Sequence, residues 1–311
     1  MSETQNKLVV VGSVAVDHVI TPKAEREHSV GGSATFAAMA AAFHAPVKLV
    51  GVVGKDFPDQ TIKDFESSKI DLEGLEVVPD GLTFRWKGKY HENMNDRDTL
   101  ETHLNCFEHF DPKLPASYRD ASHLFLGNIQ PTLQAAVLDQ MNTRPKVVGL
   151  DTMNLWIDVA SDELRSVLGR VDILMINEEE ARQLSGKDNL VKAARDVLAL
   201  GPRHLVIKRG EYGALLFGPD GDLFSAPGLP LDEVADPTGA GDCFAGGFMG
   251  YLAGTEQADG KSLRAAMIWG SVMASFCVQN FSYDAIKALD EATIAARYET
   301  FVGLADFPRG R

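Results

Sequence analysis

The chain has 311 residues, of which 24% are charged and 45% are hydrophobic, enough to bury the core of one large or two ordinary domains. Its 30 basic and 44 acidic residues give a formal net charge of −14. We therefore expect no nucleic-acid or membrane partner, because both require a basic face. The three cysteines are far apart in the sequence and indicate neither a disulfide framework nor a thiolate zinc site. With no signal-like start and no apolar stretch of about 18 residues, the sequence predicts a cytoplasmic protein.

Short apolar, β-branched runs alternate with helical patterns along the chain. Because these runs are continuously apolar, they are typical of strands buried on both faces. The pattern predicts an α/β fold with a central, mostly parallel sheet covered by helices on both faces. No linker divides the chain, so we expect a single domain over 1–311. Strand-like runs lie at 8–16, 47–53, 123–127, 146–150, 172–176 and 204–208, and helical patterns at 33–45, 131–142 and 189–200.

One segment, 83–110, departs from this rhythm because aromatic and polar residues alternate in it without a helical stripe. Such a period of two favours antiparallel strands with one solvated face. Together with 18–30, this segment predicts a small sheet that projects from the main one. The functional interpretation of this small sheet is a lid over a site or a contact in a homodimer. The alternative is a surface hairpin with neither role.

Several strand-like runs are followed closely by a polar residue. In open α/β sheets, ligands bind beyond the carboxyl ends of the strands, so these side chains are candidates for one shared crevice. The alternative for each is a helix cap or a turn residue. The six residues are Asp17, Asp56, Asn128, Asp151, Asn177 and Lys208.

The sharpest chemical signal is D-P-T-G-A-G-D at 236–242, which precedes an apolar, small-residue run typical of a buried helix. Gly239, Ala240 and Gly241 expose backbone N–H groups at a helix start, where the unpaired donors and the helix dipole hold an anion such as a phosphoryl group. Asp242 follows directly and can accept a proton from an attacking hydroxyl. The alternative is an acidic residue that only satisfies the helix dipole.

The D-P-T-G-A-G-D string with the following F-A-G-G-F resembles the C-terminal signature of the ribokinase-like (PfkB) carbohydrate kinases, and residues 31–56 resemble their N-terminal signature. The order of G-S-V-A-V-D, N-E-E-E and K-R-G-E-Y-G agrees with that family over nearly the whole chain. The resemblance implies a ribokinase-like α/β domain with a small β-lid. It also implies transfer of the γ-phosphoryl group of ATP to an alcohol.

The same resemblance implies roles for individual residues. Asp242 is the expected base, beside an anion hole of Gly239, Ala240 and Gly241. Asn177 and Glu180 match the family's N-x-x-E motif and are expected to place Mg²⁺ through water, although a helix-capping box is the structural alternative. A K⁺ ion near Asp236 is a further expectation from some relatives. The expected nucleotide-binding residues are Asn177, Lys208, Gly210, Gly213 and Thr238, with Lys208 where the family pattern has threonine; the expected acceptor-binding residues are Asp17, Gly32, Ser33 and Phe36.

Two departures from the family pattern concern the acceptor. Phe36 stands where the family commonly has a sugar-binding asparagine, and Ser33 is similar to the nucleoside-kinase branch. An aromatic ring stacks on a purine or covers an apolar sugar face, or it packs in the core. We therefore predict a kinase for a nucleoside, adenosine-like, or a small sugar. The alternatives are a kinase for a cyclitol of the myo-inositol type and a non-catalytic sugar or nucleotide sensor.

Overall fold

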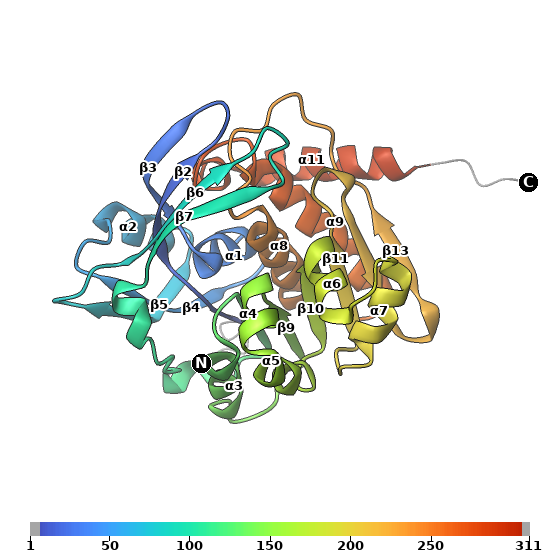
Figure 1. The fold of residues 1–311 in the computed structure, drawn as a ribbon, viewed down its shortest axis with the longest axis horizontal. Coiled ribbons are helices and arrows are strands. Elements are labelled where there is room, and N and C mark those ends of the chain that lie inside the picture. Colours follow the sequence, from blue (N-terminus) through green and yellow to red (C-terminus); the bar gives the residue numbers. More distant parts are fainter. Residues whose placement is uncertain (1–6, 307–311) are drawn as a thin grey trace, which may run out of the picture.

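The computed structural model describes residues 7–306, which form two sheets and the helices around them (Figure 1). The larger sheet has nine strands, and all its neighbours pair in parallel except for β12 and β13 at one edge. The predicted mostly parallel sheet is thus confirmed. In spatial order its strands are β13 (Leu223–Ala226), β12 (Ala214–Phe217), β11 (His204–Lys208), β10 (Ile173–Asn177), β9 (Val147–Asp151), β8 (His123–Leu126), β1 (Leu8–Val11), β4 (Val47–Gly54) and β5 (Ile70–Val78).

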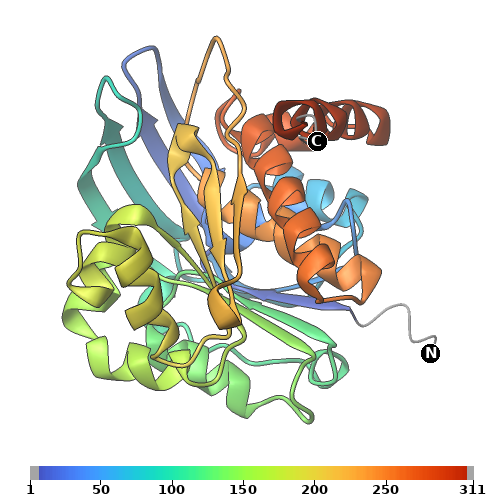
Figure 2. The ribbon, with the colours of Figure 1, turned by 90° about the vertical axis from the view of Figure 1, so that its right-hand side faces the viewer.

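Helices cover both faces of this sheet, as predicted (Figure 2). Successive residues of β1 belong to different cores, because Leu8 and Val10 face one helical layer while Val9 and Val11 face the other. One layer contains α1 (Ser33–Ala41), α2 (Asp59–Ser67), α8 (Ala240–Thr255), α9 (Gly260–Cys277), α10 (Asp284–Lys287) and α11 (Glu291–Ala305). The other contains α3 (Pro131–Asp139), α4 (Asn154–Val159), α5 (Ser161–Leu168), α6 (Glu178–Ser185) and α7 (Leu190–Leu198). Among residues 7–306, no helix combines the length and apolarity needed to cross a membrane.

The smaller sheet, which we call the lid, has the order β3 (Glu25–Gly31), β2 (Ala15–Ile20), β6 (Phe84–Tyr90) and β7 (Arg97–His103). It projects from one end of the larger sheet (Figure 1). Its strands end earlier than the predicted boundary at Phe110, because Asn105 adopts a φ of 49° and begins a 3₁₀ helix, Asn105–His109. The Asn105 amide also donates to the Thr83 carbonyl at 2.8 Å, which fastens this turn to the base of the lid.

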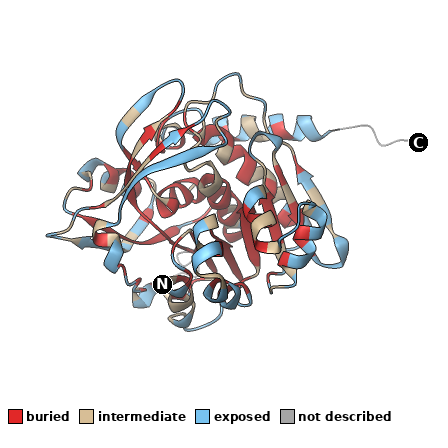
Figure 3. Cartoon of the chain, viewed as in Figure 1, coloured by how far each residue is buried: buried red, intermediate tan, exposed pale blue. Residues whose placement is uncertain are grey.

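Helix α1 is completely buried and α8 is buried along its middle (Figure 3), and the two helices run parallel in close contact. A Cβ at Gly246 would overlap the Ala37 carbonyl, and one at Gly250 would lie 2.7 Å from the Ala41 Cα. Glycine is therefore required one turn apart on α8, where the α1 backbone passes. Since the two helices are parallel, both of their N-termini lie at the same end of the molecule.

Replacing Gly246 with alanine tests this close packing. Although alanine favours a helix, the new Cβ forces the α1 backbone away, so we expect Gly246→Ala to lose about 1–3 kcal/mol of unfolding free energy. The matched control is Gly303→Ala in α11, where a Cβ meets nothing within 4 Å and should add about 0.5–1 kcal/mol. Urea unfolding of both variants measures the difference. Equal stability changes in the two variants would contradict the packing argument.

Candidate active site

The D-P-T-G-A-G-D segment forms the entry to α8. Gly239 adopts a φ of 78° and is the N-cap, and no side chain caps the helix. The Ala240 N–H donates to the Pro237 carbonyl at 3.2 Å, whereas no acceptor among residues 7–306 takes the N–H of Gly241. The helix start therefore keeps a free backbone donor beside Asp242, as an anion site needs, but the Ala240 donor is already occupied.

A buried charge cluster lies next to this helix start. Lys208 at the end of β11 donates to Asp151 at the end of β9, with 2.6 Å between Nζ and Oδ2. Lys208 also lies against the anion loop, because a Cβ at Gly241 would be 3.1 Å from its Nζ. Burial lowers the pKa of Lys208, but the charges of Asp151 and Glu180 outweigh this effect and keep the ammonium charged.

The cluster contains three carboxyl groups, of Asp151, Glu180 and Asp242, and one lysine, and the pKa values of all three carboxyl groups are raised. Burial, with the charge of Asp151 added, raises the pKa of Asp242 to about 7, although Lys208 and Arg97 act in the opposite direction. Burial and Asp151 likewise raise the pKa of Glu180 to about 7. The cluster therefore lacks positive charge, and a cation or a cationic side chain would lower these pKa values.

Asn177 and Glu180 form the capping box of α6. The Asn177 Oδ1 accepts from the Glu180 N–H at 2.8 Å, and the Glu180 Oε2 accepts from the Asn177 N–H at 2.7 Å. The structural alternative for this pair is thus present. It does not consume the second carboxylate oxygen of Glu180, whose charge acts on Lys208 in the adjacent strand. Both residues therefore lie in the cluster while they also stabilise the helix start.

The predicted acceptor residues lie where the lid joins α1. The Asp17 carboxylate lies over Gly31, where a Cβ would overlap it, and is 6% exposed with no hydrogen bond from residues 7–306. Burial, with the charges of Asp236 and Asp242 added, raises its pKa well above the usual value. Gly32 is the N-cap of α1 with a φ of 94°, and a Cβ there would overlap the Ser13 carbonyl.

Ser33 and Phe36, the other two predicted acceptor residues, are held by the protein itself. The Ser33 hydroxyl accepts from the Ser13 N–H at 3.2 Å, and the Ser13 hydroxyl accepts from the Ser33 N–H at 3.0 Å. The Phe36 ring is 1% exposed and packs against Gly239, where a Cβ would overlap it. Phe36 therefore packs against the anion loop, residues 236–242, and exposes almost no surface to a ligand.

The predicted nucleotide residues continue from β11 into the turn that leads to β12. Gly210 has a φ of 55°, and Gly213 has a φ of 84°. A Cβ at Gly213 would overlap the Ala226 carbonyl of β13, and one at Gly210 would lie 2.7 Å from the Asn95 Oδ1 at the tip of the lid. The turn between β11 and β12 thus needs glycine for its backbone conformation, and the tip of the lid lies next to it.

Asp236 and Thr238 connect the anion loop to the lid. The Thr238 N–H donates to the Asp236 Oδ1 at 2.8 Å, and the Thr238 hydroxyl donates to the Tyr90 Oη of β6 at 3.1 Å. The other carboxylate oxygen of Asp236 is buried and has no hydrogen-bond partner among residues 7–306. An orphaned, buried carboxylate oxygen is a suitable ligand for a cation.

The remaining strand-end residues serve other purposes. Asp56 accepts from the N–H and hydroxyl of Thr83 and pairs with Arg85, so it holds the base of the lid. Asn128 accepts from the Trp156 indole. Their sequence position alone did not distinguish them from Asp151. Asp151 was predicted as a strand-end candidate, and its ion pair with Lys208 places it in the charge cluster. Ser13, Tyr90 and Arg97, which contact Ser33, contact Thr238 and act on the pKa of Asp242 respectively, were not predicted, because the sequence does not show the directions of their side chains.

Three further acidic and histidine side chains, His18, Glu25 and Glu27, place their ligand atoms within 4.8 Å of one another. They line or border a hollow of about 270 Å³ that also includes Lys87, Glu101 and His103. Since residues alternate across a strand, His18 lies on the opposite lid face from Asp17. This group is therefore separate from the buried charge cluster.

Comparison with known proteins agrees with this geometry. Residues 5–287 match the model of the pfkB family of carbohydrate kinases, and the chain belongs to that family. It is a sugar or nucleoside kinase, a phosphotransferase that acts on a hydroxyl group.

Individual relatives extend this result. A cytidine kinase of Thermococcus kodakarensis is 34% identical over 252 residues, which are 79% of this chain and 89% of that protein. A Burkholderia thailandensis nucleoside kinase solved with inosine has a TM-score of 0.77 at 21% identity, over 95% of this chain and 98% of that one. An E. coli protein described as a ribokinase II, solved with ATP and Mg²⁺, has a TM-score of 0.76 at 21% identity, over 96% and 99% of the two chains. The predicted family and the ribokinase-like fold are confirmed, and these relatives give no support to the cyclitol kinase or the sensor.

The raised pKa of Asp242 predicts a stability effect that is independent of activity. A carboxyl with a folded-state pKa of about 7 costs stability progressively as pH rises from about 4, its unfolded value, to 7. We therefore expect Asp242→Asn to melt at a higher temperature than the parent at pH 8, by a smaller margin at pH 5, and at nearly the same temperature at pH 4. Thermal unfolding without ligand measures this, with the surface variant Asp188→Asn as control. A parent that is more stable than Asp242→Asn at pH 8 would contradict the charge assignment.

Proposed function

We propose that this protein is an ATP-dependent nucleoside kinase that transfers the γ-phosphoryl group to a hydroxyl of a nucleoside, with cytidine as the first candidate. The observation that carries the proposal is the 34% identity with a cytidine kinase over most of both chains. Ser33, which follows the glycine pair at the start of α1, is consistent with the nucleoside branch. A simple sugar such as ribose is the second candidate.

In this proposal Asp242 is the general base. It lies in the first turn of α8 beside the free Gly241 N–H, so an acceptor hydroxyl there faces both a base and an anion site. Its pKa of about 7 is close to the value at which a base is both deprotonated and strong enough to accept a proton near neutral pH. The N–H groups at 239–241 stabilise the charge of the transferred group.

The acceptor would bind between the lid and α1. The unpartnered Asp17 carboxylate would accept hydrogen bonds from two hydroxyls of a ribose, and the backbone at Gly32 allows close approach. Ser33 would contribute to acceptor binding indirectly, because its hydrogen bonds with Ser13 fix the backbone at the start of α1. Phe36 as an acceptor wall stays a prediction; its contact with Gly239 favours a role in holding the anion loop.

The donor would bind along the end of β11 and its turn. Gly210 and Gly213 give the backbone room for the nucleotide, Thr238 and Asn177 lie at the loop and the helix start beside it, and Lys208 places its charge near the phosphates. Lys208 takes the place of a threonine contact, because its Nζ lies beside Gly241.

The excess of negative charge in the cluster fits a divalent cation. Asn177 and the free oxygen of Glu180 would hold Mg²⁺ through water, and Mg²⁺ when bound neutralises the phosphate charge. The orphaned oxygen of Asp236 fits K⁺. A homodimer through the lid and a cytoplasmic location stay predictions.

The proposal is tested by initial rates with ATP and Mg²⁺ across cytidine, uridine, adenosine, inosine, ribose, fructose and myo-inositol. We expect nucleosides to exceed free sugars and cytidine to rank first. Asp242→Asn is the control and should lower turnover about 10²-fold or more, because the base is lost. Ribose as the best substrate would overturn the nucleoside assignment, and near-normal turnover of folded Asp242→Asn would remove Asp242 from the mechanism.

The magnesium assignment has a separate test, because glutamine can keep a capping box while it removes the charge. We expect Glu180→Gln to unfold at nearly the parent temperature but to need about tenfold more Mg²⁺ for half-maximal rate. The neighbouring exposed residue provides the control Glu179→Gln. If the magnesium titration of Glu180→Gln overlays that of the parent, the residue only caps the helix.

A further inference from the structure

The outer face of the lid, opposite to the face that carries Asp17, holds a cluster of one histidine and two glutamates. The His18 Nε2 lies 2.6 Å from the Glu25 Oε1 and 3.9 Å from the Glu27 Oε1. Among residues 7–306, this is the one group of three histidine, cysteine or acidic side chains whose ligand atoms all lie within 4.8 Å of one another. Because His18 belongs to β2 and both glutamates belong to β3, the cluster bridges the two strands of a hairpin.

The hairpin sets the direction of the two glutamates. Glu25 and Glu27 are two residues apart on β3, so their side chains leave the same face of the strand. Arg26 between them pairs with Asp284 of α10 at 2.7 Å, so its side chain points toward the large domain. The two glutamates therefore point away from that domain.

His18 points the same way as the glutamates. Its neighbour Val19 is the cross-strand partner of Arg26 and packs with Phe281 on the inner face of the lid. Since successive side chains of a strand alternate between its faces, His18 reaches the outer face.

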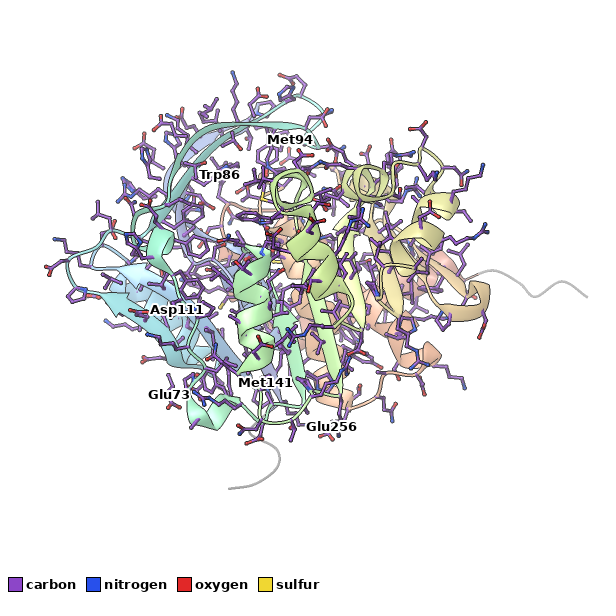
Figure 4. All side chains as sticks on the ribbon, turned by 60° about the horizontal axis from the view of Figure 1, so that its bottom comes forward. Glu73, Trp86, Met94, Asp111, Met141 and Glu256 are labelled. Atoms are coloured by element: carbon purple, nitrogen blue, oxygen red, sulfur yellow. The ribbon has the colours of Figure 1, made fainter. Side chains whose placement is uncertain are left out.

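A hollow of about 270 Å³ adjoins the cluster. Its lining includes His18, Glu27 and two further histidines, His28 and His103. Figure 4 marks this part of the lid, because Trp86, which also lines the hollow, is labelled there. An ion held by the three clustered side chains would therefore have room for water or for a fourth side chain in its remaining positions.

The charge of the two glutamates is not balanced by lysine or arginine. In the described part of the chain, 7–306, the ion pairs of Glu25 and Glu27 are with His18 alone. The two basic residues that line the hollow each pair with another acidic residue, Arg85 with Asp56 and Lys87 with Glu101. A divalent cation would supply the missing positive charge.

The spacing and the chemistry of the cluster suit a transition-metal ion. Two ligands that lie about 2.1 Å from a tetrahedral Zn²⁺ are roughly 3.4 Å apart, and the two distances from the His18 Nε2 bracket this value. Glu25 and Glu27 are 56% and 64% exposed, so their side chains are free to make the remaining adjustment. An imidazole nitrogen favours Zn²⁺ over Mg²⁺, which prefers oxygen ligands.

We propose that His18, Glu25 and Glu27 form a site for a divalent transition-metal ion that joins β2 to the edge strand β3 on the outer face of the lid. The imidazole Nε2 and one oxygen of each carboxylate hold the ion, and water completes its coordination. The ion spans the shift in strand register between Asp17 and Val19, and so stiffens the strand that carries Asp17. The site is separate from the Mg²⁺ site of the proposed function and does not rest on the kinase reaction.

Calorimetric titration with ZnCl₂ tests the proposal on protein freed of metal with EDTA, without nucleotide and with millimolar Mg²⁺ to occupy oxygen-only sites. We expect the parent to bind a single Zn²⁺ per chain, and His18→Gln and Glu27→Gln to weaken this binding about tenfold or more, because each removes a ligand. The matched control is His91→Gln, since His91 is a lid histidine that pairs with one carboxylate, of Asp98, at 3.0 Å. Its affinity for Zn²⁺ should equal that of the parent.

Co²⁺ gives the same test a spectroscopic readout. We expect Co²⁺ to produce the visible absorption of a low-coordinate ion in the parent and in His91→Gln, and to lose this absorption in His18→Gln. If the parent binds no Zn²⁺, or if His18→Gln binds it as tightly as the parent, the inference is overturned. An equal loss of affinity in His91→Gln would indicate dispersed surface binding and would also overturn it. Because no nucleotide is present, none of these outcomes depends on which substrate the protein phosphorylates.

Discussion

The close, parallel contact between α1 and α8 is the constraint on which the site depends. Gly246 and Gly250 remove the side chains that would keep the helices apart, so the two N-termini start at one end of the sheet. One terminus carries Gly32 beside the Asp17 carboxylate, and the other carries Gly239 and Asp242. Because both helix dipoles then present their positive ends to the same space, an anion placed there is stabilised from two directions. The Phe36 ring against Gly239 locks the two starts together.

The second feature of the site is its negative charge, which acts against the binding of an anion at the two helix N-termini. Burial and Asp151 raise the pKa of Asp242 and of Glu180 to about 7, so the site is electrostatically frustrated at neutral pH. Such frustration lowers the stability of the folded protein. It also makes the site responsive to cations and to proton transfer, since each added positive charge stabilises the ionised carboxylates. The same groups that weaken the fold therefore suit a site that binds a nucleotide with its metal.

Sequence periodicity predicted the large sheet because its strands are continuously apolar. Strands β5, β12 and β13 were not predicted; β5 alternates polar and apolar residues, and β13 is mostly exposed. The anion loop could be predicted because one short segment contains the glycines and the carboxylate. The ion pair between Asp151 and Lys208 could not, because it joins strands 57 residues apart whose order in the sheet the sequence does not show. Phe36 illustrates the same limit: its position was evident, but its contact with Gly239 depends on how two helices cross.

The contacts of the lid differ between its base and its tip. Asp56 secures the base through Thr83 and Arg85, and the Arg26 pair with Asp284 secures the outer strand. The tip is instead held by a single hydroxyl contact to Thr238, by the Asn95 approach to Gly210 and by a small apolar cluster. Fewer and weaker contacts hold the tip than hold the base. If the proposed kinase function holds, we expect the lid to open at its tip for substrates to enter, while the strand that carries Asp17 stays in register with the rest of the site.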